Sequence, residues 1–292
     1  MLLINWRINN MPVVIPYWGG KYKLSKVLIP MIPEHKHYIE VFAGGLSMFF
    51  HKAKAEWNCV NDISNDLANL YMVIGDEYLF NVFARKVYYA IKSRAYYDQI
   101  RQNIQKENQF TLPDVERAFN YYYFIRNSFN SRLNTAFNKD ITGWTVSMLN
   151  TLKFARERLN GVIVENMDFS KLIDKYGHKE NTFWYFDPPY TMADTEEYYL
   201  WTFSEEQHIQ MFKDIEMICA TSDAKIMVSY DDSDFVKQLY KDFHITEIKT
   251  KYSGNRANPD EEFTELIITN YHHQQQESLN FEDTDGEFGK EY

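Results

Sequence analysis

The chain has 292 residues, and its content of 45% hydrophobic and 17% aromatic side chains is enough to bury the core of one large domain with a subdomain. Cys59 and Cys219 are too few to build a disulfide scaffold, so we expect a reducing, cytoplasmic compartment. Residues 1–10 lack the apolar core of a signal peptide and no apolar run is long enough to span a bilayer, so no membrane is expected.

The first motif in the chain is Pro-Tyr-Trp-Gly-Gly-Lys-Tyr-Lys-Leu, residues 16–24. Two glycines between aromatic residues and a lysine predict a tight turn that can place the ring of Tyr17 and the cation of Lys21 beside one ligand. The same pattern also suits a plain turn that leads into an amphipathic helix from Leu24 to Met31.

Residues 38–50 predict a buried strand, a glycine turn and a helix. Gly44 and Gly45 would let the backbone of this turn approach a ligand closely, beside Phe42. The next strand, from Trp57 to Asn61, ends at Asp62, which can accept hydrogen bonds from ribose hydroxyls. These features suggest a bound adenosine moiety. Because a full Gly-x-Gly-x-x-Gly is missing, a dinucleotide such as NAD fits less well.

The middle of the chain is predicted to be helical and is basic. Helices are expected from Tyr78 to Gln105, Asp114 to Phe129 and Thr145 to Asn160. Residues 85–158 contain thirteen Lys/Arg and six Asp/Glu, a net charge of +7 within a chain of net charge −10. Such a local patch can steer DNA even on an acidic protein, although a solvated helical surface would have the same composition.

A loop within this segment is rich in groups that donate to phosphates and base edges. Its candidate DNA-binding residues are Arg126, Asn130, Arg132 and Lys139, together with Asn134 and Asn138. The preceding aromatic run, residues 121–124, fits the core of a helix better than a stacking platform, because consecutive helical positions cannot all face one ligand.

The strongest functional signal is Asp187-Pro188-Pro189-Tyr190, directly after the apolar strand of residues 183–186. An aromatic amine is a poor nucleophile because its lone pair is delocalised into the ring. If Asp187 and the carbonyl of Pro188 accept its N–H bonds, they aim that lone pair at an electrophilic methyl group, which is catalysis by positioning and electrostatics. The prolines stiffen the loop, and Tyr190 can stack on the aromatic ring that bears the amine. An ordinary turn after a strand is the competing interpretation.

The remaining elements alternate between strands and helices. A strand is expected at Gly161–Glu165, followed by Asp168, then a helix with a capping box at Ser204–Thr221 and a strand at Lys225–Ser229. Two more strands are expected at residues 243–252 and 263–270. This order predicts a mostly parallel sheet with an antiparallel edge strand and a site at the carboxyl ends of the strands. Residues 272–292 carry six acids and one lysine and are predicted to be a disordered tail.

Together and in this order, the motifs resemble the α-class, Dam-like DNA adenine-N6 methyltransferases, which use S-adenosylmethionine and no metal. The similarity runs from about Pro16 to Tyr271. It implies a Rossmann-like catalytic domain of residues 11–76 and 160–271, with a helical target-recognition subdomain, residues 77–159, inserted between the two parts. The implied reaction methylates a flipped-out adenine in double-stranded DNA.

The resemblance also assigns roles at the positions that match. Cofactor contacts are implied for Tyr17, Lys21, Phe42, Gly44, Asp62, Asp168 and Asp187, and catalysis for Asp187, Pro188, Pro189 and Tyr190. Two positions depart from the family pattern. Leu46 replaces the last glycine of the turn, which is tolerable if Leu46 already belongs to the helix, and Ser131 replaces a glycine of the DNA-contacting segment.

Other functions remain compatible with the residues. The site could serve an RNA base or a protein glutamine, since similar loops methylate those nitrogens, or the chain could be a DNA-binding relative without catalysis. A bacterial or phage-infected cell is the expected setting, with a cognate restriction endonuclease as a candidate partner and a monomer or weak dimer as the expected assembly.

Overall fold

The computed structural model describes residues 13–17, 19–106, 111–128, 136–138, 146–190, 203–251 and 262–273. Its centre is a seven-stranded sheet formed by β1 (His37–Glu40), β2 (Trp57–Asn61), β3 (Ile163–Glu165), β4 (Thr182–Phe186), β5 (Lys225–Asp231), β6 (His244–Lys251) and β7 (Glu262–Thr269). The strand order is β3-β2-β1-β4-β5-β7-β6, and the first five strands in that order run parallel. β7 pairs antiparallel with both β5 and β6. The predicted α/β fold is confirmed.

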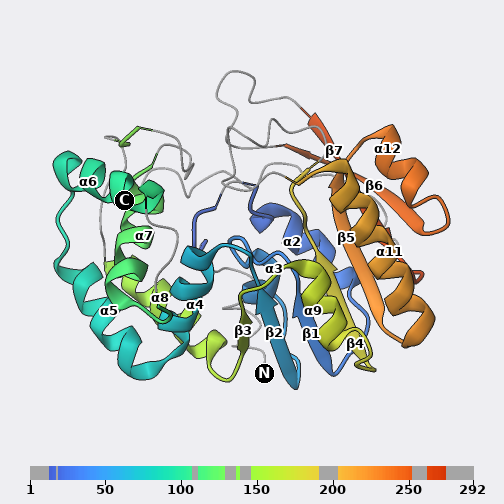
Figure 1. Ribbon diagram of the computed structural model, residues 1–292, viewed down its shortest axis with the longest axis horizontal. Coiled ribbons are helices and arrows are strands. Elements are labelled where there is room, and N and C mark those ends of the chain that lie inside the picture. Colours follow the sequence, from blue (N-terminus) through green and yellow to red (C-terminus); the bar gives the residue numbers. More distant parts are fainter. Residues whose placement is uncertain are drawn as a thin grey trace.

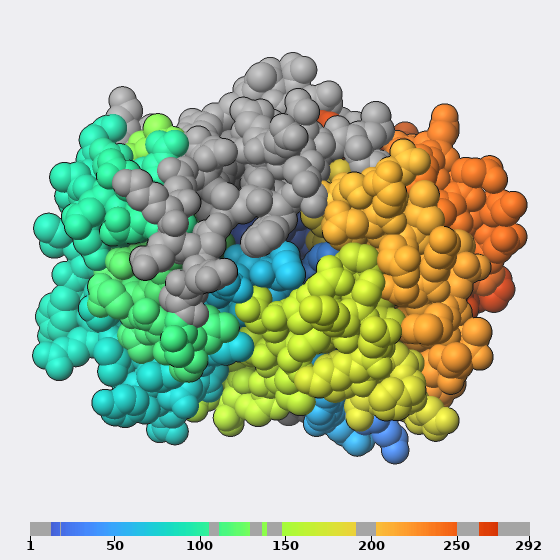
Figure 2. All heavy atoms as spheres, in the orientation of Figure 1, coloured from blue at the N-terminus to red at the C-terminus, as the bar shows by residue number. Residues whose placement is uncertain are grey.

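Helices cover the sheet and form a separate group at one end (Figure 1). Figure 2 shows α9 (Phe169–Tyr176) and α11 (Glu205–Thr221) as an adjoining yellow-green and orange surface on one side. The group at the end comprises α4 (Asn65–Gly75), α5 (Glu77–Tyr89), α6 (Arg94–Lys106), α7 (Val115–Asn127) and α8 (Val146–Leu159). Among the described residues there are also the helices α2 (Tyr22–Leu28), α3 (Ser47–His51) and α12 (Asp234–Leu239).

Alternating strand residues divide the interior into two cores. Tyr38 of β1 and its neighbour Phe183 of β4 belong to the core that also contains the inner faces of α3, α4, α7 and α8. Ile39 and its neighbour Trp184 belong to the other core, against α9 and α11. Because successive strand residues point to opposite faces, both faces of this sheet must be apolar. The helical group therefore shares one continuous core with the sheet.

The single helix expected at Tyr78–Gln105 is wrong: the structure has two helices there, α5 and α6, separated by residues 90–93. The hydroxyl of Tyr123 on α7 accepts the N–H of Ser93 at 2.8 Å and lies 3.0 Å from the carbonyl oxygen of Ile91. These bonds satisfy backbone groups that a continuous helix would have paired internally. A contact from a distant helix thus sets the break, which local sequence does not reveal.

The other predicted elements agree with the structure within a few residues. Ser204 and Gln207 form the expected capping box at the start of α11. The helix expected at Leu24–Met31 begins earlier, as α2, and ends in a short 3₁₀ turn, Ile29–Met31, with Pro30 in its first positions. The sequence did not predict the bounds of α4, and the short helices α9 and α12 were not predicted from it.

Candidate functional site

The carboxyl ends of four adjacent parallel strands carry the predicted site residues. Gly44 follows β1, Asp62 follows β2, Asp168 follows β3 and Asp187 follows β4. Since the strands are ordered β3-β2-β1-β4, the residues are ordered Asp168, Asp62, Gly44, Asp187 along this edge. In open α/β sheets, ligands bind outside the carboxyl ends of the strands.

The glycine turn joins the first two motifs to Asp62. Gly44 has φ +45°, and its N–H donates to Oδ2 of Asp62 at 2.9 Å. The hydroxyl of Tyr71 on α4 donates to the Gly44 carbonyl. A Cβ at Gly44 would lie 3.2 Å from the ring of Tyr17, so the tyrosine packs directly on the turn. The structure brings Tyr17, Gly44 and Asp62 together, and glycine is required by both backbone conformation and space.

Leu46 does not belong to the helix, contrary to the condition on which its replacement of glycine was judged tolerable. It is the residue before α3, with φ 53° and ψ 34°, in the left-handed region. Its side chain is fully buried in the core shared by the sheet and the helical group. The leucine side chain thus fills the interior while the backbone at this position is strained.

Asp62 is held by backbone donors on both sides. Besides Gly44, the N–H of Ser64 donates to its Oδ1 at 2.9 Å, and Ser64 caps α4. Burial raises the pKa of the Asp62 carboxyl above its ordinary value, while the two backbone bonds act in the opposite direction. A carboxylate has about four acceptor positions, so two remain for hydroxyl groups of a ligand.

Asp168 begins α9 as its cap, with its Oδ1 accepting the N–H of Ser170 at 2.9 Å. Within the described part of the chain its other oxygen has no hydrogen-bond partner, so Asp168 retains acceptor capacity at the edge. Phe42 lies nearby, with its ring 6.0 Å from that of Phe169 and 5.7 Å from that of Phe203. The aromatic rings form an apolar wall beside the acceptors.

The loop after β4 joins residues from both ends of the chain. Lys21 Nζ lies 2.9 Å from Oδ1 of Asp187, and the two side chains are 6% and 20% exposed. The same ammonium lies 4.6 Å from the centre of the Tyr190 ring, and the Tyr190 hydroxyl donates to Glu265 of β7. Pro188 is buried and Pro189 is partly exposed. The structure therefore places Lys21, Asp187 and Tyr190 in one cluster.

Two residues that support this cluster were not predicted. Ser229 of β5, fully buried, donates to Asp187 Oδ1 at 3.0 Å and lies 2.9 Å from the hydroxyl of Tyr185. Glu265 anchors Tyr190, as described above. For Ser229 the available signal was a polar residue inside an apolar run, whereas β7 contains several polar residues and does not single out Glu265; nothing in the local sequence indicates the partner of either.

A third residue missed from the sequence is Glu40, at the end of β1 and only 2% exposed. It accepts hydrogen bonds from the hydroxyl of Tyr38 at 2.8 Å and the N–H of Phe49 at 3.0 Å. Burial raises the pKa of this carboxyl to about 8, and the nearby charge of Asp187 adds to the rise. Burial also lowers the pKa of Lys52, whose ammonium lies 4.1 Å from the Tyr38 ring centre, to about 7. Burial thus moves the pKa values of both Glu40 and Lys52 toward neutrality.

Of the candidate DNA-binding residues, Arg126 lies in the last turn of α7 and is partly exposed. Asn130, Arg132 and Lys139 lie outside the described residues, as does Ser131. Tyr121, Tyr122, Tyr123 and Phe124 are at most 2% exposed, which confirms that this run is core rather than a stacking surface. Past the helix, the carbonyl of Asn127 accepts the N–H of Asn138 at 2.7 Å.

Among the helices that the structure describes, none is long and apolar enough to cross a membrane. Within the same described residues, no group of three or more His, Cys, Asp or Glu side chains could hold a metal ion.

The chain is similar to known methyltransferases over most of its length. The chain is 28% identical over 290 residues to the Type II methyltransferase M1.LlaDCHI of Lactococcus lactis subsp. cremoris, covering 92% of this chain and 99% of that protein. It is 26% identical over 275 residues to the Type II methyltransferase M.CviBI of Paramecium bursaria Chlorella virus NC1A, covering 89% of this chain and 100% of that protein. Residues 17–254 match the family model described as D12 class N6 adenine-specific DNA methyltransferase, and the chain belongs to that family.

Proposed function

We propose that S-adenosylmethionine is the methyl donor and that it lies along the carboxyl edge of β3, β2, β1 and β4. The observation that supports this arrangement is the order Asp168, Asp62, Gly44, Asp187 across adjacent strands. In this arrangement Asp168 accepts from the adenine amine and Asp62 from the ribose hydroxyls, with Tyr17 and Phe42 shaping the pocket. The methionine end then lies between Gly44 and Asp187.

The donor chemistry of the residues fits this co-substrate. Asp168 and Asp62 both retain acceptor capacity, as an amine and a diol require, and the glycine at position 44 lets the Tyr17 ring pack against the turn beside them. S-adenosylmethionine supplies the electrophilic methyl group. The contribution of the protein is to hold the two reactants in line and to exclude other geometries.

At Asp187, the target amine would take the place of a lysine. Lys21 Nζ at 2.9 Å demonstrates that Oδ1 of Asp187 accepts from a nitrogen donor at normal hydrogen-bond length. Ser229 holds the same oxygen from the sheet side. When adenine N6 donates to Asp187 and to the carbonyl of Pro188, its lone pair is directed at the methyl group. Lys21 must then shift toward its other partners, which include the Gly19 carbonyl at 3.2 Å.

The target base must leave the double helix to reach this loop, because a stacked base cannot enter it. Tyr190 would stack on the flipped adenine, and its bond to Glu265 keeps the ring in a fixed orientation. Pro188 and Pro189 limit the motion of the loop between the two acceptors and the ring.

The helical insertion, residues 77–159, would recognise the DNA around that base. Within it, residues 85–158 carry a net charge of +7, in contrast with −10 for the whole chain, so basic charge is concentrated in the insertion. Arg126, Asn130, Arg132 and Lys139 are the proposed contacts with phosphates and base edges. We further propose a cytoplasmic monomer or weak dimer that protects DNA from a cognate restriction endonuclease, because the full-length relatives are named Type II methyltransferases.

The first experiment is to incubate the purified protein with methyl-labelled S-adenosylmethionine and unmethylated phage λ DNA, with total RNA in parallel. Digestion to nucleosides should give labelled N6-methyladenine from DNA alone, and sequencing of the modified sites gives the target. The Asp187→Ala variant should lose transfer while it still binds the co-substrate in a titration. Equal activity of Asp187→Ala and wild type would refute the assigned mechanism, and label in RNA would redirect the substrate.

A further inference from the structure

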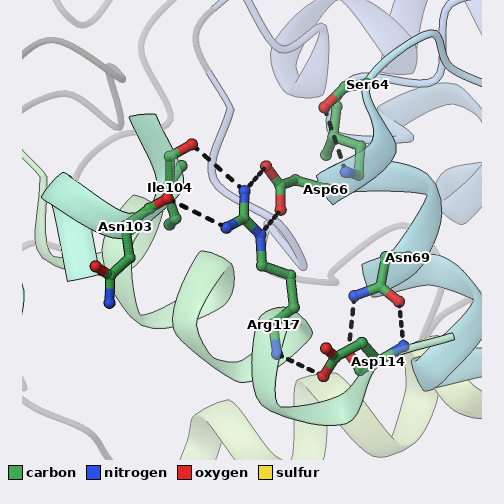
Figure 3. A network of polar contacts seen from close by, with 8 residues as sticks. Ser64, Asp66, Asn69, Asn103, Ile104, Asp114 and Arg117 are labelled. Carbon is green, nitrogen blue, oxygen red and sulfur yellow. Dashed lines mark hydrogen bonds and ion pairs between the residues drawn. The ribbon is translucent and has the colours of Figure 1, made fainter. Parts of the chain in front are cut away.

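The buried guanidinium of Arg117 joins the helical insertion to α4, the helix that follows the Asp62 loop. Nε of Arg117 on α7 lies 2.5 Å from Oδ1 of Asp66 on α4, and its Nη2 lies 2.9 Å from Oδ2 (Figure 3). The side chains are 8% and 7% exposed. This two-bond pairing fixes the relative orientation of two planar groups, which a single contact would not do.

The same side chain reaches a third helix. Nη1 of Arg117 donates to the carbonyl of Asn103 at 3.5 Å and Nη2 to that of Ile104 at 3.4 Å, near the end of α6. A parallel link is made by Asn69 of α4, which exchanges two hydrogen bonds, at 2.8 and 2.7 Å, with the backbone of Asp114 (Figure 3). Asp114 caps α7, so both links act on the first turn of that helix.

The two helices that Arg117 joins lead to the proposed sites of different ligands, α4 to that of the co-substrate and α7 to that of DNA. α4 begins directly after the loop in which Ser64 donates to Asp62, the proposed ribose acceptor. The last turn of α7 carries Arg126, nine positions or roughly 14 Å beyond Arg117 along the helix. Beyond α7, Ser128 forms a bridge with Phe137, so the end of the helix also holds the segment that follows. A small rotation of α7 about its first turn would displace all of these groups.

Packing of α4 against α7 does not require an ion pair. The helices share an apolar core that includes Leu67, Leu70, Tyr121 and Phe124. Replacing a buried ion pair with apolar residues is often neutral or stabilising, because removing two charges from water offsets much of their attraction. What the apolar core lacks is a fixed angle and register, which the two-bond pair supplies.

We infer that Arg117 is a positioning residue for DNA methylation, which acts through Asp66 to set the place of the DNA-contacting end of α7 relative to the cofactor edge. The inference rests on the proposed role of the helical insertion in DNA recognition. Breaking the pair lets α7 shift, so the target base and the methyl donor meet in the right geometry less often. Misplacement of reactants by about 1 Å can cost on the order of a hundredfold in rate.

The test uses a duplex of about 30 base pairs that carries the target mapped with λ DNA, and a second duplex with one base pair of the target changed. Arg117→Lys keeps the charge but loses the two-bond pairing, and Asn69→Ala weakens the parallel link without leaving a buried charge. For Arg117→Lys, kcat/KM on the target duplex should fall about tenfold, and discrimination between the duplexes should fall with it. Asn69→Ala should change both in the same direction by less. Affinity for S-adenosylmethionine should stay within about twofold.

Glu116→Gln is the matched control, because Glu116 lies in the same turn of α7 and pairs with Lys86 on the outer surface at 2.5 Å. It should leave both kinetic quantities unchanged. A lower unfolding temperature for Arg117→Lys with unchanged discrimination would overturn the inference and leave a structural role. If Arg126→Ala in the wild-type background leaves DNA affinity unchanged, the DNA role of the insertion fails instead, and the two failures are thus distinguishable.

Discussion

Leu46 shows how one residue can be unfavourable for the backbone and favourable for the core. A left-handed conformation costs a residue other than glycine roughly 1–2 kcal/mol, whereas loss of a buried leucine side chain costs about 3–5 kcal/mol. The second effect is larger, so the leucine is a net stabiliser of the turn that carries Gly44. The sequence showed the departure from glycine, but it did not show which effect would dominate.

Replacement of Leu46 separates these effects. Leu46→Gly should lower the free energy of unfolding by roughly 2–3 kcal/mol, since relief of strain offsets part of the lost burial. Leu46→Ala loses most of the same burial but retains the strain, so it should be less stable than Leu46→Gly by about 1 kcal/mol. Urea unfolding of both variants measures the difference, and a more stable alanine variant would contradict this account.

Glu40 makes stability depend on pH. Its pKa of about 8 in the folded protein lies above the ordinary value, so the folded state binds more protons than the unfolded state between about pH 4.5 and 8. Stability from this group is complete at low pH and is lost as pH rises through that window, by at most about 1.4 kcal/mol per unit. Lys52, with a pKa of about 7, acts in the opposite direction at higher pH.

Glu40→Gln is expected to remove the Glu40 contribution, because glutamine does not titrate. The free energy of unfolding of the wild type minus that of the variant should fall steadily from pH 5 to pH 8, measured with urea at each pH. A difference independent of pH would mean that Glu40 is already charged across this range.

At the level of elements, apolar runs of residues that favour β-structure predicted the strands well. The ends of the helices, in contrast, depend on contacts between distant parts of the chain. The strands at Trp57–Asn61 and Lys225–Asp231 have local signals that end in polar residues. The break between α5 and α6 depends on Tyr123, about thirty positions away in the chain. Short helices such as α9 and α12, of 8 and 6 residues, present too few turns for a clear apolar period.

Removal of the Tyr123 hydroxyl tests the origin of the break. Tyr123→Phe should cost about 1–3 kcal/mol, because the N–H of Ser93 loses its acceptor. Amide hydrogen exchange should become faster at residues 90–93. Tyr96→Phe is the control, since the Tyr96 hydroxyl donates to the side chain of Asn120 and satisfies no backbone N–H. Equal exchange in the two variants would exclude Tyr123 as the cause.

For the whole molecule, the clustering of Gly44, Asp62, Asp168 and Asp187 at one edge could be predicted because each follows a strand, and parallel strands bring such positions together. What the sequence could not give is pairing across the edge: Lys21 with Asp187, Ser229 with Asp187, and Tyr190 with Glu265. These contacts join segments 42 to 166 positions apart. Their formation depends on strand order rather than on local pattern.

The uneven charge of the molecule should appear in the salt dependence of DNA binding. Each phosphate contact releases counterions, so Arg126→Ala should reduce the slope of log affinity against log salt concentration by about 1. Fluorescence anisotropy with a labelled duplex, between 50 and 200 mM salt, measures that slope. Lys86→Gln, which removes a cation already paired with Glu116, should leave the slope unchanged. A slope equal to that of the wild type for Arg126→Ala would place the DNA elsewhere on the protein.

The bond from Tyr190 to Glu265 has a consequence for the order in which activity can arise during synthesis. Glu265 belongs to β7, the last strand along the chain among the residues that the structure describes, and β7 lies between β5 and β6. A nascent chain can form the cofactor edge from β1 to β4 long before β7 has left the ribosome. The ring of Tyr190, which would hold the target base, however, gains its hydrogen bond to Glu265 only when β7 docks. Newly made protein should therefore form the proposed co-substrate site first and the proposed binding site for the target base last.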